Sequence, residues 1–138
     1  MILHSYLTFN GNCRQAMNFY RDCLGGELFF QTVGETPLSE KMPPKMRDYI
    51  LHSSLTKDDL TLMATDMVPE SGLIKGNSVS LALTCKSEEE IRDVYKKLSY
   101  GGEATHPLEI SFFGAIMGGL TDRYGINWIF YYDAEQNG

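Results

Sequence analysis

Apolar residues recur at helical spacing in two stretches of the chain, and runs of β-branched and aromatic residues flank both. The first helix is predicted over residues 12–24, where apolar positions lie three or four residues apart. The second is predicted to begin after Ser87, a good N-cap, with Glu88, Glu89 and Glu90 in the first turn, where the helix dipole favours acids. We expect both apolar stripes to be core.

The two helical stretches belong to an internal repeat. In the first copy a Tyr-Leu-Thr-Phe run at 6–9 precedes the helix, and in the second an Ala-Leu-Thr-Cys run stands at 82–85. Leu7 and Leu83 are 76 residues apart, and so are Gly25 and Gly101 in the Gly-Gly pairs after the helices. A constant offset at both ends indicates two copies of one module, each ending its helix with a left-handed glycine.

After each helix the pattern changes to short runs that are typical of strands. These runs cover residues 27–33, 49–56 and 60–66 in the first half and 104–110, 112–121 and 127–132 in the second. Each half therefore reads as βαβββ. The sequence predicts an α+β fold in which two βαβββ modules form a curved mixed sheet around a cleft.

The chain is expected to be a single domain over residues 1–138, with repeat halves 1–67 and 78–138 joined by a linker at 68–77. Residues 34–48 hold three prolines among charged residues and are predicted to be a long mobile loop, able to act as a lid. The pair Gly118-Gly119 falls inside a strand pattern and suggests a bulge.

Charge and hydropathy exclude several classes of protein. The formal net charge is -6 and no basic stripe is present, which argues against nucleic-acid binding. No apolar run reaches the roughly 20 residues that cross a bilayer, and the amino terminus does not resemble a signal peptide. We therefore expect no membrane partner and a cytoplasmic protein.

Several reactive residue types have structural explanations. Cys13, Cys23 and Cys85 form an odd set without C-x-x-C spacing, which suits buried, reduced thiols. Asp66 ends a predicted strand and Asp122 opens a predicted turn, both positions where Asp commonly binds the backbone.

Several short motifs carry a resemblance to a known family. The paired modules and the stretch from Asn18-Phe19-Tyr20 to Leu24-Gly25-Gly26 resemble the vicinal oxygen chelate superfamily, which includes glyoxalase I, extradiol dioxygenases and bleomycin-resistance proteins. The runs at 6–16, 34–37, 63–66, 112–114 and 120–128 are similar to its PhnB-like branch. Phe113 stands where that branch usually has Trp.

The resemblance implies a metal held by His, Gln or Glu from four strands. The corresponding positions hold Ser5 on the first strand, Leu62 and Met63 on the fourth, residues 78–80 on the fifth and Ile129 on the last. Because none of these is a usual ligand, we expect no metal and no other cofactor. The old methyltransferase label of the branch is also unsupported, since the chain leaves no room for a nucleotide-binding sheet.

A cleft without metal ligands suits an apolar or planar small molecule. Taking the strand face of Ser5 as inward, we predict a ligand site made of Ser5, Phe9, His52, Met63, Phe113 and Trp128. His52 is either a hydrogen-bonding or basic group in the site or an ordinary strand histidine. Trp128 is either core or cleft wall, and His106 is expected to be exposed outside the cleft.

The resulting hypothesis is a small-molecule binding protein. We expect it to be a homodimer, because Phe29, Phe30, Trp128 and Phe130 supply more aromatic surface than one domain buries easily. The alternative is an enzyme of the glyoxalase or dioxygenase type that uses the same cleft, either metal-free or with His52 as an unusual ligand. The identity of the ligand cannot be read from the sequence.

Overall fold

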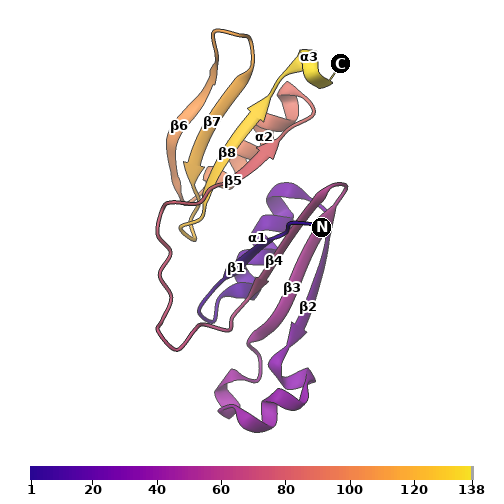
Figure 1. Ribbon diagram of the computed structural model, residues 1–138, viewed down its shortest axis with the longest axis vertical. Helices are drawn as coiled ribbons and strands as arrows, with labels where there is room; N and C mark the ends of the chain where they lie inside the picture. Colours follow the sequence, from indigo (N-terminus) through magenta and orange to yellow (C-terminus); the bar gives the residue numbers. More distant parts are fainter. Residues whose placement is uncertain (138) are drawn as a thin grey trace. The chain divides into compact units, whose positions relative to one another are not determined.

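The computed structural model describes residues 1–137, and the chain divides into two units, Met1–Ile74 and Lys75–Gly138. The boundary falls within the segment predicted as a linker. In each unit one long helix lies against one face of a four-stranded sheet and leaves the other face open (Figure 1).

The first unit contains β1 (Ser5–Thr8), α1 (Cys13–Leu24), β2 (Glu27–Thr32), β3 (Ile50–Lys57) and β4 (Leu60–Thr65). Its strand order is β1-β4-β3-β2, with β1 parallel to β4 and the other pairs antiparallel. The helix buries Ala16, Met17 and Tyr20 against Leu55, Leu62 and Ala64 of the sheet. This hydrophobic layer is the core of the unit.

The second unit repeats this plan with β5 (Leu81–Thr84), α2 (Glu88–Ser99), β6 (Glu103–Ile110), β7 (Ile116–Thr121) and β8 (Asn127–Tyr132). Its strand order is β5-β8-β7-β6, with β5 parallel to β8. A short helix, α3 (Ala134–Asn137), follows. The predicted α+β class and the two βαβββ modules are confirmed, with the strands forming one separate mixed sheet per module.

Two predicted segments differ from the structure. The strand predicted at 112–121 begins only at Ile116, because the preceding residues form the β6–β7 turn, closed by the bond from the Ser111 amide to the Ala115 carbonyl oxygen. The segment predicted as a mobile loop at 34–48 instead contains short 3-10 turns, η1 (Val33–Glu35), η2 (Pro37–Lys41) and η3 (Pro44–Met46). Prolines at the starts of η2 and η3 suit such turns.

The second glycine of each Gly-Gly pair is required by a close backbone approach. A Cβ on Gly26 would lie 2.6 Å from the carbonyl oxygen of Thr56, and one on Gly102 would lie 2.4 Å from that of Thr121. Both distances are far inside van der Waals contact. The repeat is thus visible in the sequence partly because the two modules need the same two glycines.

The predicted structural roles of the cysteines and of both aspartates are confirmed. Cys13, Cys23 and Cys85 are free, buried thiols. Asp66 accepts hydrogen bonds from the amides of Gly11, Cys13 and Ile50, which ties β4 to the beginning of α1 and of β3. A buried carboxylate that accepts three amide bonds is a structural link between elements.

Asp122 plays the corresponding role in the second unit. One carboxylate oxygen accepts from the amides of Tyr124 and Ile126, and the other accepts from the indole Nε1 of Trp128 at 2.8 Å. These bonds hold the tight turn between β7 and β8.

Candidate functional site

The open face of the second sheet is defined by the strand register. His106 of β6 lies opposite Gly119 of β7, which lies opposite Ile129 of β8, and Ile129 pairs with Ala82 of β5. Paired residues project to the same side of a sheet, so these four form one row across it. The neighbouring rows on the same face contain Thr121 with Asn127 and Met117 with Tyr131.

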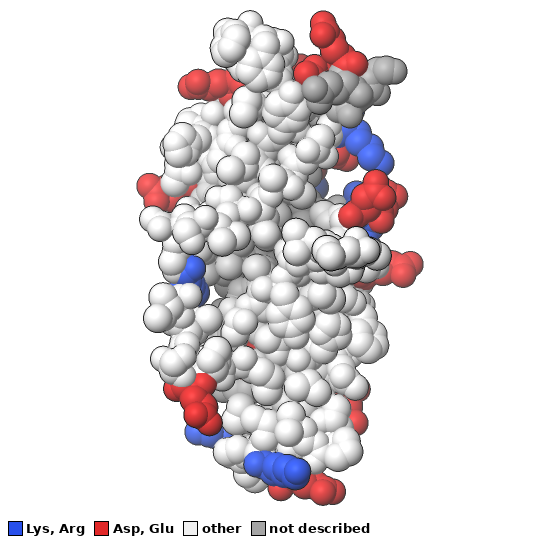
Figure 2. Space-filling model, in the orientation of Figure 1, with Lys and Arg blue, Asp and Glu red and all other residues white. Residues whose placement is uncertain are grey.

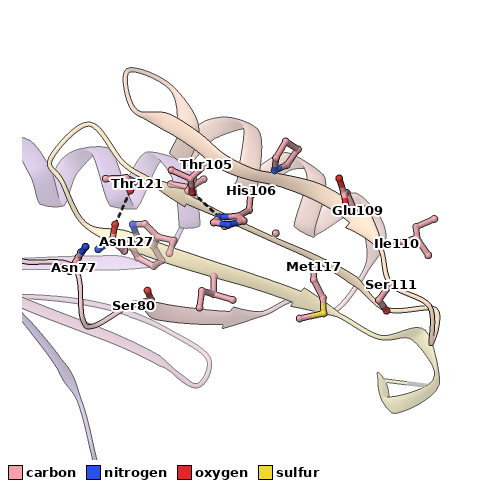
Figure 3. Close-up of a pocket in the computed structure, with 16 residues that line it drawn as sticks. Asn77, Ser80, Thr105, His106, Glu109, Ile110, Ser111, Met117, Thr121 and Asn127 are labelled. Carbon is pink, nitrogen blue, oxygen red and sulfur yellow. Dashed lines mark hydrogen bonds between the residues drawn. The ribbon is translucent and has the colours of Figure 1, made fainter.

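A groove of about 690 Å³ lies along this open face (Figure 3). It extends from the segment before β5, across β8 and β7, to β6. Its lining combines apolar side chains with hydroxyl, amide and imidazole groups, and the residues are Asn77, Ser80, Thr105, His106, Pro107, Glu109, Ile110, Ser111, Met117, Gly118, Gly119, Leu120, Thr121, Asn127, Trp128 and Ile129. Such a mixture is typical of small-molecule sites.

The shape of the groove depends on extra residues in β6. Glu103 pairs with Thr121 and His106 pairs with Gly119, so β6 advances by three residues over a distance in which β7 advances by two. The same difference of one residue recurs before the pair Glu109–Met117. Each excess residue is a bulge, which bends the strand and redirects side chains. Thr105 and His106 can therefore both line the groove although they are neighbours in the chain. The bulge predicted at Gly118-Gly119 is therefore not in β7, which pairs regularly with β8, and the extra residues belong to β6 opposite it.

The two adjacent glycines of β7 face opposite ways. Gly118 is paired with the buried Phe130, and a Cβ there would lie 2.8 Å from Cδ2 of Leu108 and 3.0 Å from the carbonyl oxygen of His106. Gly119 faces the groove, where a Cβ would stand 3.8 Å from the His106 ring. Gly118 thus permits β6 to approach, whereas a Cβ on the buried Gly119 would also lie 3.2 Å from the carbonyl oxygen of Trp128, so Gly119 allows close packing at the groove floor.

Polar groups gather at one end of the groove. The Thr121 hydroxyl donates to Oδ1 of Asn127 at 2.8 Å, and Nδ1 of His106 lies 3.3 Å from the Thr105 hydroxyl oxygen (Figure 3). Among the groove residues Glu109 is the only Lys, Arg, Asp or Glu side chain. The site is therefore rich in neutral hydrogen-bonding groups and poor in charge.

Two of the residues predicted for the site lie on the wrong face. Ser5 pairs with the buried Leu62, and its hydroxyl donates to the carbonyl oxygen of Thr61. Phe9 is 1% exposed in the core under α1. The expectation that the strand face of Ser5, Leu7 and Phe9 points into an open cleft is wrong, because this face packs against the helix.

His52 and Met63 do lie together on the open face of the first sheet. Tyr6 pairs with Met63, Met63 pairs with Ser54, and the rings of Tyr6 and His52 stack with centroids 6.1 Å apart. This open face belongs to the first unit, whereas the groove residues belong to the second. The structure brings His52 and Met63 together and separates both from Ser5.

Phe113 and Trp128 have different surroundings. Phe113 stands in the exposed β6–β7 turn, half exposed, with its ring edge-on to Phe112. Trp128 is 3% exposed and its indole is bound to Asp122, yet the residue also bounds the groove. The reading of Trp128 as a core residue agrees with its burial and with its pairing with the buried Leu120.

Sequence reasoning missed His106, Thr121 and Asn127 as groove residues. His106 is exposed, as predicted, but it lines the groove. The glycine pair in β7 was the available signal, because glycine inside a strand marks a bulge or a close approach of another backbone or a ligand.

The residues present do not fit the metal that the superfamily resemblance implies. Within residues 1–137 no three His, Cys, Asp or Glu side chains come together in a group that could hold an ion. The positions expected for ligands hold Ser5, Leu62 and Ile129, none of which is a usual ligand. No step of a reaction is therefore derived through a metal.

The surface carries both signs of charge. On the face drawn in Figure 2, Lys and Arg side chains stand singly or in small groups among acidic ones, mostly near the margins. Within the part of the chain that the structure describes, no helix has both the length and the apolar character that crossing a bilayer requires.

Comparisons with known proteins agree with this architecture. The chain is 29% identical to the protein YjdN of Escherichia coli over 138 residues, covering 94% of this chain and 93% of that protein. The solved structure of PA1353 from Pseudomonas aeruginosa is 32% identical with a TM-score of 0.84, covering 96% of this chain and 98% of the other. A PhnB protein from Bacillus cereus, described as a putative 3-demethylubiquinone-9 3-methyltransferase, is 25% identical with a TM-score of 0.72 over 96% and 100%.

The fold extends to more distant proteins. A member of the glyoxalase/bleomycin resistance protein/dioxygenase superfamily from Sphaerobacter thermophilus is 19% identical and superimposes with a TM-score of 0.59, covering 96% of this chain and 98% of the other. This likeness shows that the superfamily shares the fold, and the PhnB-like resemblance read from the sequence motifs is confirmed. Residues 2–130 match the family described as 3-demethylubiquinone-9 3-methyltransferase, and the chain belongs to that family.

Proposed function

We propose that this protein binds a small apolar or planar molecule on the open face of its second sheet. The observation that carries the proposal is the groove itself, where Met117 and Ile129 provide apolar surface beside the polar groups of His106 and Asn127. Burial of apolar area would supply most of the affinity, and the polar groups would orient the ligand.

The exposure of the groove side chains supports the proposal. Ile129 is 45% exposed and Met117 is 39% exposed, although both stand in the middle of strands. The free energy falls when a ligand or partner covers apolar side chains on a sheet face, because their surface is removed from water. The family's methyltransferase description finds no support in this groove, which has no glycine-rich phosphate loop or Rossmann pattern beside it.

The open face of the first sheet remains a second proposed contact surface. His52 and Met63 lie there with the stacked Tyr6, and both are partly exposed. We propose that this face makes contacts of its own, and we propose a homodimer as the working form.

A titration of the ¹⁵N-labelled protein with 2-ethylnaphthalene, a planar apolar probe, tests the proposal. We expect saturable shifts of the backbone amides of Gly119, Thr121 and Ile129. Ile129→Glu should abolish them, because it places a charge on the groove floor. A matched variant, Phe113→Glu, adds the same charge in the exposed turn and should leave the shifts unchanged. Saturable shifts confined to other regions, or none, would contradict the proposed site.

A further inference from the structure

We infer that the groove selects an uncharged, largely apolar molecule with a hydrogen-bond acceptor such as a carbonyl oxygen. This inference rests on the proposed function and adds the chemical class of the ligand. Three features of the groove lead to it: the unused amide donors of Asn127, the charge of the lining and the exposed apolar side chains.

The donors come from the side-chain amide of Asn127. Its Oδ1 accepts a hydrogen bond from the Thr121 hydroxyl, which fixes the orientation of the amide group. Among residues 1–137 the amide nitrogen has no hydrogen-bond partner, so both of its hydrogens are available to a ligand. The His106 ring lies beside this end of the groove, with its Nδ1 3.3 Å from the Thr105 hydroxyl oxygen.

The charge of the lining argues against an anion. Donors without a fixed positive charge suit a neutral acceptor, whereas carboxylates and phosphates are usually held by Arg or Lys. No Arg or Lys lines the groove, and the carboxylate of Glu109 lies on its rim. The formal net charge of -6 also disfavours the approach of an anion. A carbonyl or similar neutral oxygen therefore matches these donors better than an acid.

The exposed apolar side chains of the groove argue for a ligand with an apolar body. Ile129 and Met117 lie on the open face of the sheet and are 45% and 39% exposed. Covering them removes apolar surface from water, which favours binding. The ligand therefore combines an apolar part with the acceptor that Asn127 can bind.

The test compares three probes of the same shape in the ¹⁵N titration: 2-acetylnaphthalene, 2-ethylnaphthalene and 2-naphthoate. The first carries a neutral acceptor, the second has none and the third is an anion. We expect 2-acetylnaphthalene to bind about fivefold more tightly than either of the others, the scale of one hydrogen bond. The side-chain amide protons of Asn127 should move downfield only with 2-acetylnaphthalene.

The variant Asn127→Asp keeps the oxygen that accepts from Thr121 but replaces the amide donors with a second acceptor. We expect it to remove the preference for 2-acetylnaphthalene. Its control is Asn10→Asp, which adds the same charge at an exposed position outside the groove and should leave the preference intact.

The outcomes separate this inference from the proposed function. Groove shifts of similar affinity with all three probes would overturn the inference but leave the proposed function standing. Tighter binding of 2-naphthoate would also overturn it, since the groove would then prefer an anion. Absence of groove shifts with every probe would overturn both. The comparison of probes on the unaltered protein remains decisive even where a variant fails to fold.

Discussion

The hydroxyl of Tyr95 in α2 donates to the carbonyl oxygen of His106 in β6 at 3.0 Å. The same hydroxyl lies 3.0 Å from the carbonyl oxygen of Gly119. A helix residue therefore holds the bulged part of β6 against β7 from the side opposite the groove. His106 owes its position partly to a side chain that does not touch the groove.

Replacing Tyr95 by Phe should loosen this junction. We expect Tyr95→Phe to lower the free energy of unfolding by about 1 kcal/mol, the usual net value of a hydrogen bond, and to broaden the amide resonances of β6. Urea denaturation and ¹⁵N spectra measure the two effects. Tyr100→Phe removes a hydroxyl from a side chain that is 71% exposed and should change neither. Equal behaviour of the two variants would show that the Tyr95 bond is unimportant.

The relative weight of His106 and His52 in ligand binding can be tested directly. We expect His106→Ala to weaken the binding of 2-acetylnaphthalene by about fivefold, because the ring lines the groove beside the amide of Asn127. His52→Ala, on the open face of the first sheet, should have the smaller effect. Isothermal titration calorimetry of both variants measures the two losses of affinity. A larger loss of affinity for His52→Ala would favour the site predicted from the sequence.

Trp128 should matter more for stability than for binding. Its indole Nε1 donates to Asp122 at 2.8 Å inside the unit, so Trp128→Phe removes a bond to a buried carboxylate. We expect the free energy of unfolding to fall by about 1–3 kcal/mol, measured in urea. Phe113→Leu is the control, since that side chain is half exposed, and it should cost little. A Trp128→Phe variant as stable as the parent would contradict this role.

The buried thiols should react slowly and should destabilise the fold at high pH. Burial raises the pKa of Cys13 to about 12 and that of Cys85 to about 11, from an ordinary value of 9.0. Because these pKa values are raised, the two thiols of the folded state stay protonated at pH values at which the unfolded chain has lost these protons. Stability is therefore complete below about pH 9 and falls as the pH rises toward these values.

Two measurements check this behaviour. At pH 8 a disulfide reagent such as Ellman's reagent should modify Cys13 and Cys85 only as fast as the protein unfolds, and within seconds in denaturant. The melting temperature should fall between pH 9 and pH 11 in the parent and fall less steeply in Cys13→Ala. Fast reaction of the native protein would show that the thiols are accessible.

Association into a homodimer remains a prediction, but the exposed aromatic residues that could form its interface differ in part from those named in the sequence analysis. Trp128 and Phe130 are 3% and 0% exposed, so they cannot contribute surface, whereas Phe29 and Tyr6 are 57% and 51% exposed on the open face of the first sheet. We expect light scattering to give twice the 15.6 kDa chain mass. Phe29→Glu should shift this toward the monomer and Phe113→Glu should not. A monomeric parent protein would refute the prediction.

The fold could be predicted from the sequence because the same sequence signals for helix and strand recur in both modules. Helical spacing, the N-cap Ser87 and the Gly-Gly pairs all agree with the observed elements, and the Ser87 hydroxyl accepts from the amide of Glu90 as expected. The strand predicted at 112–121 begins too early because Phe112 and Phe113 are strong strand formers. In the structure they occupy an exposed turn.

The site was harder to predict because alternation along a strand does not say which face the helix covers. Ser5, Leu7 and Phe9 were assigned to an open cleft by analogy with ligand positions, although Leu7 and Phe9 are the more apolar set. The apolar face packs on α1, and the open face carries Tyr6. The groove also depends on two bulges in β6, which no periodicity of that strand reveals.

The irregular strand β6 also bears on aggregation. It is an edge of its sheet, where unpaired amide and carbonyl groups invite another chain to add a strand. Pro107 in its middle lacks an amide hydrogen, the extra residues spoil the regular ladder, and Glu109 adds charge. A foreign strand would find no continuous register along this edge. We therefore expect the distortion that shapes the groove also to oppose the pairing of another chain along this edge.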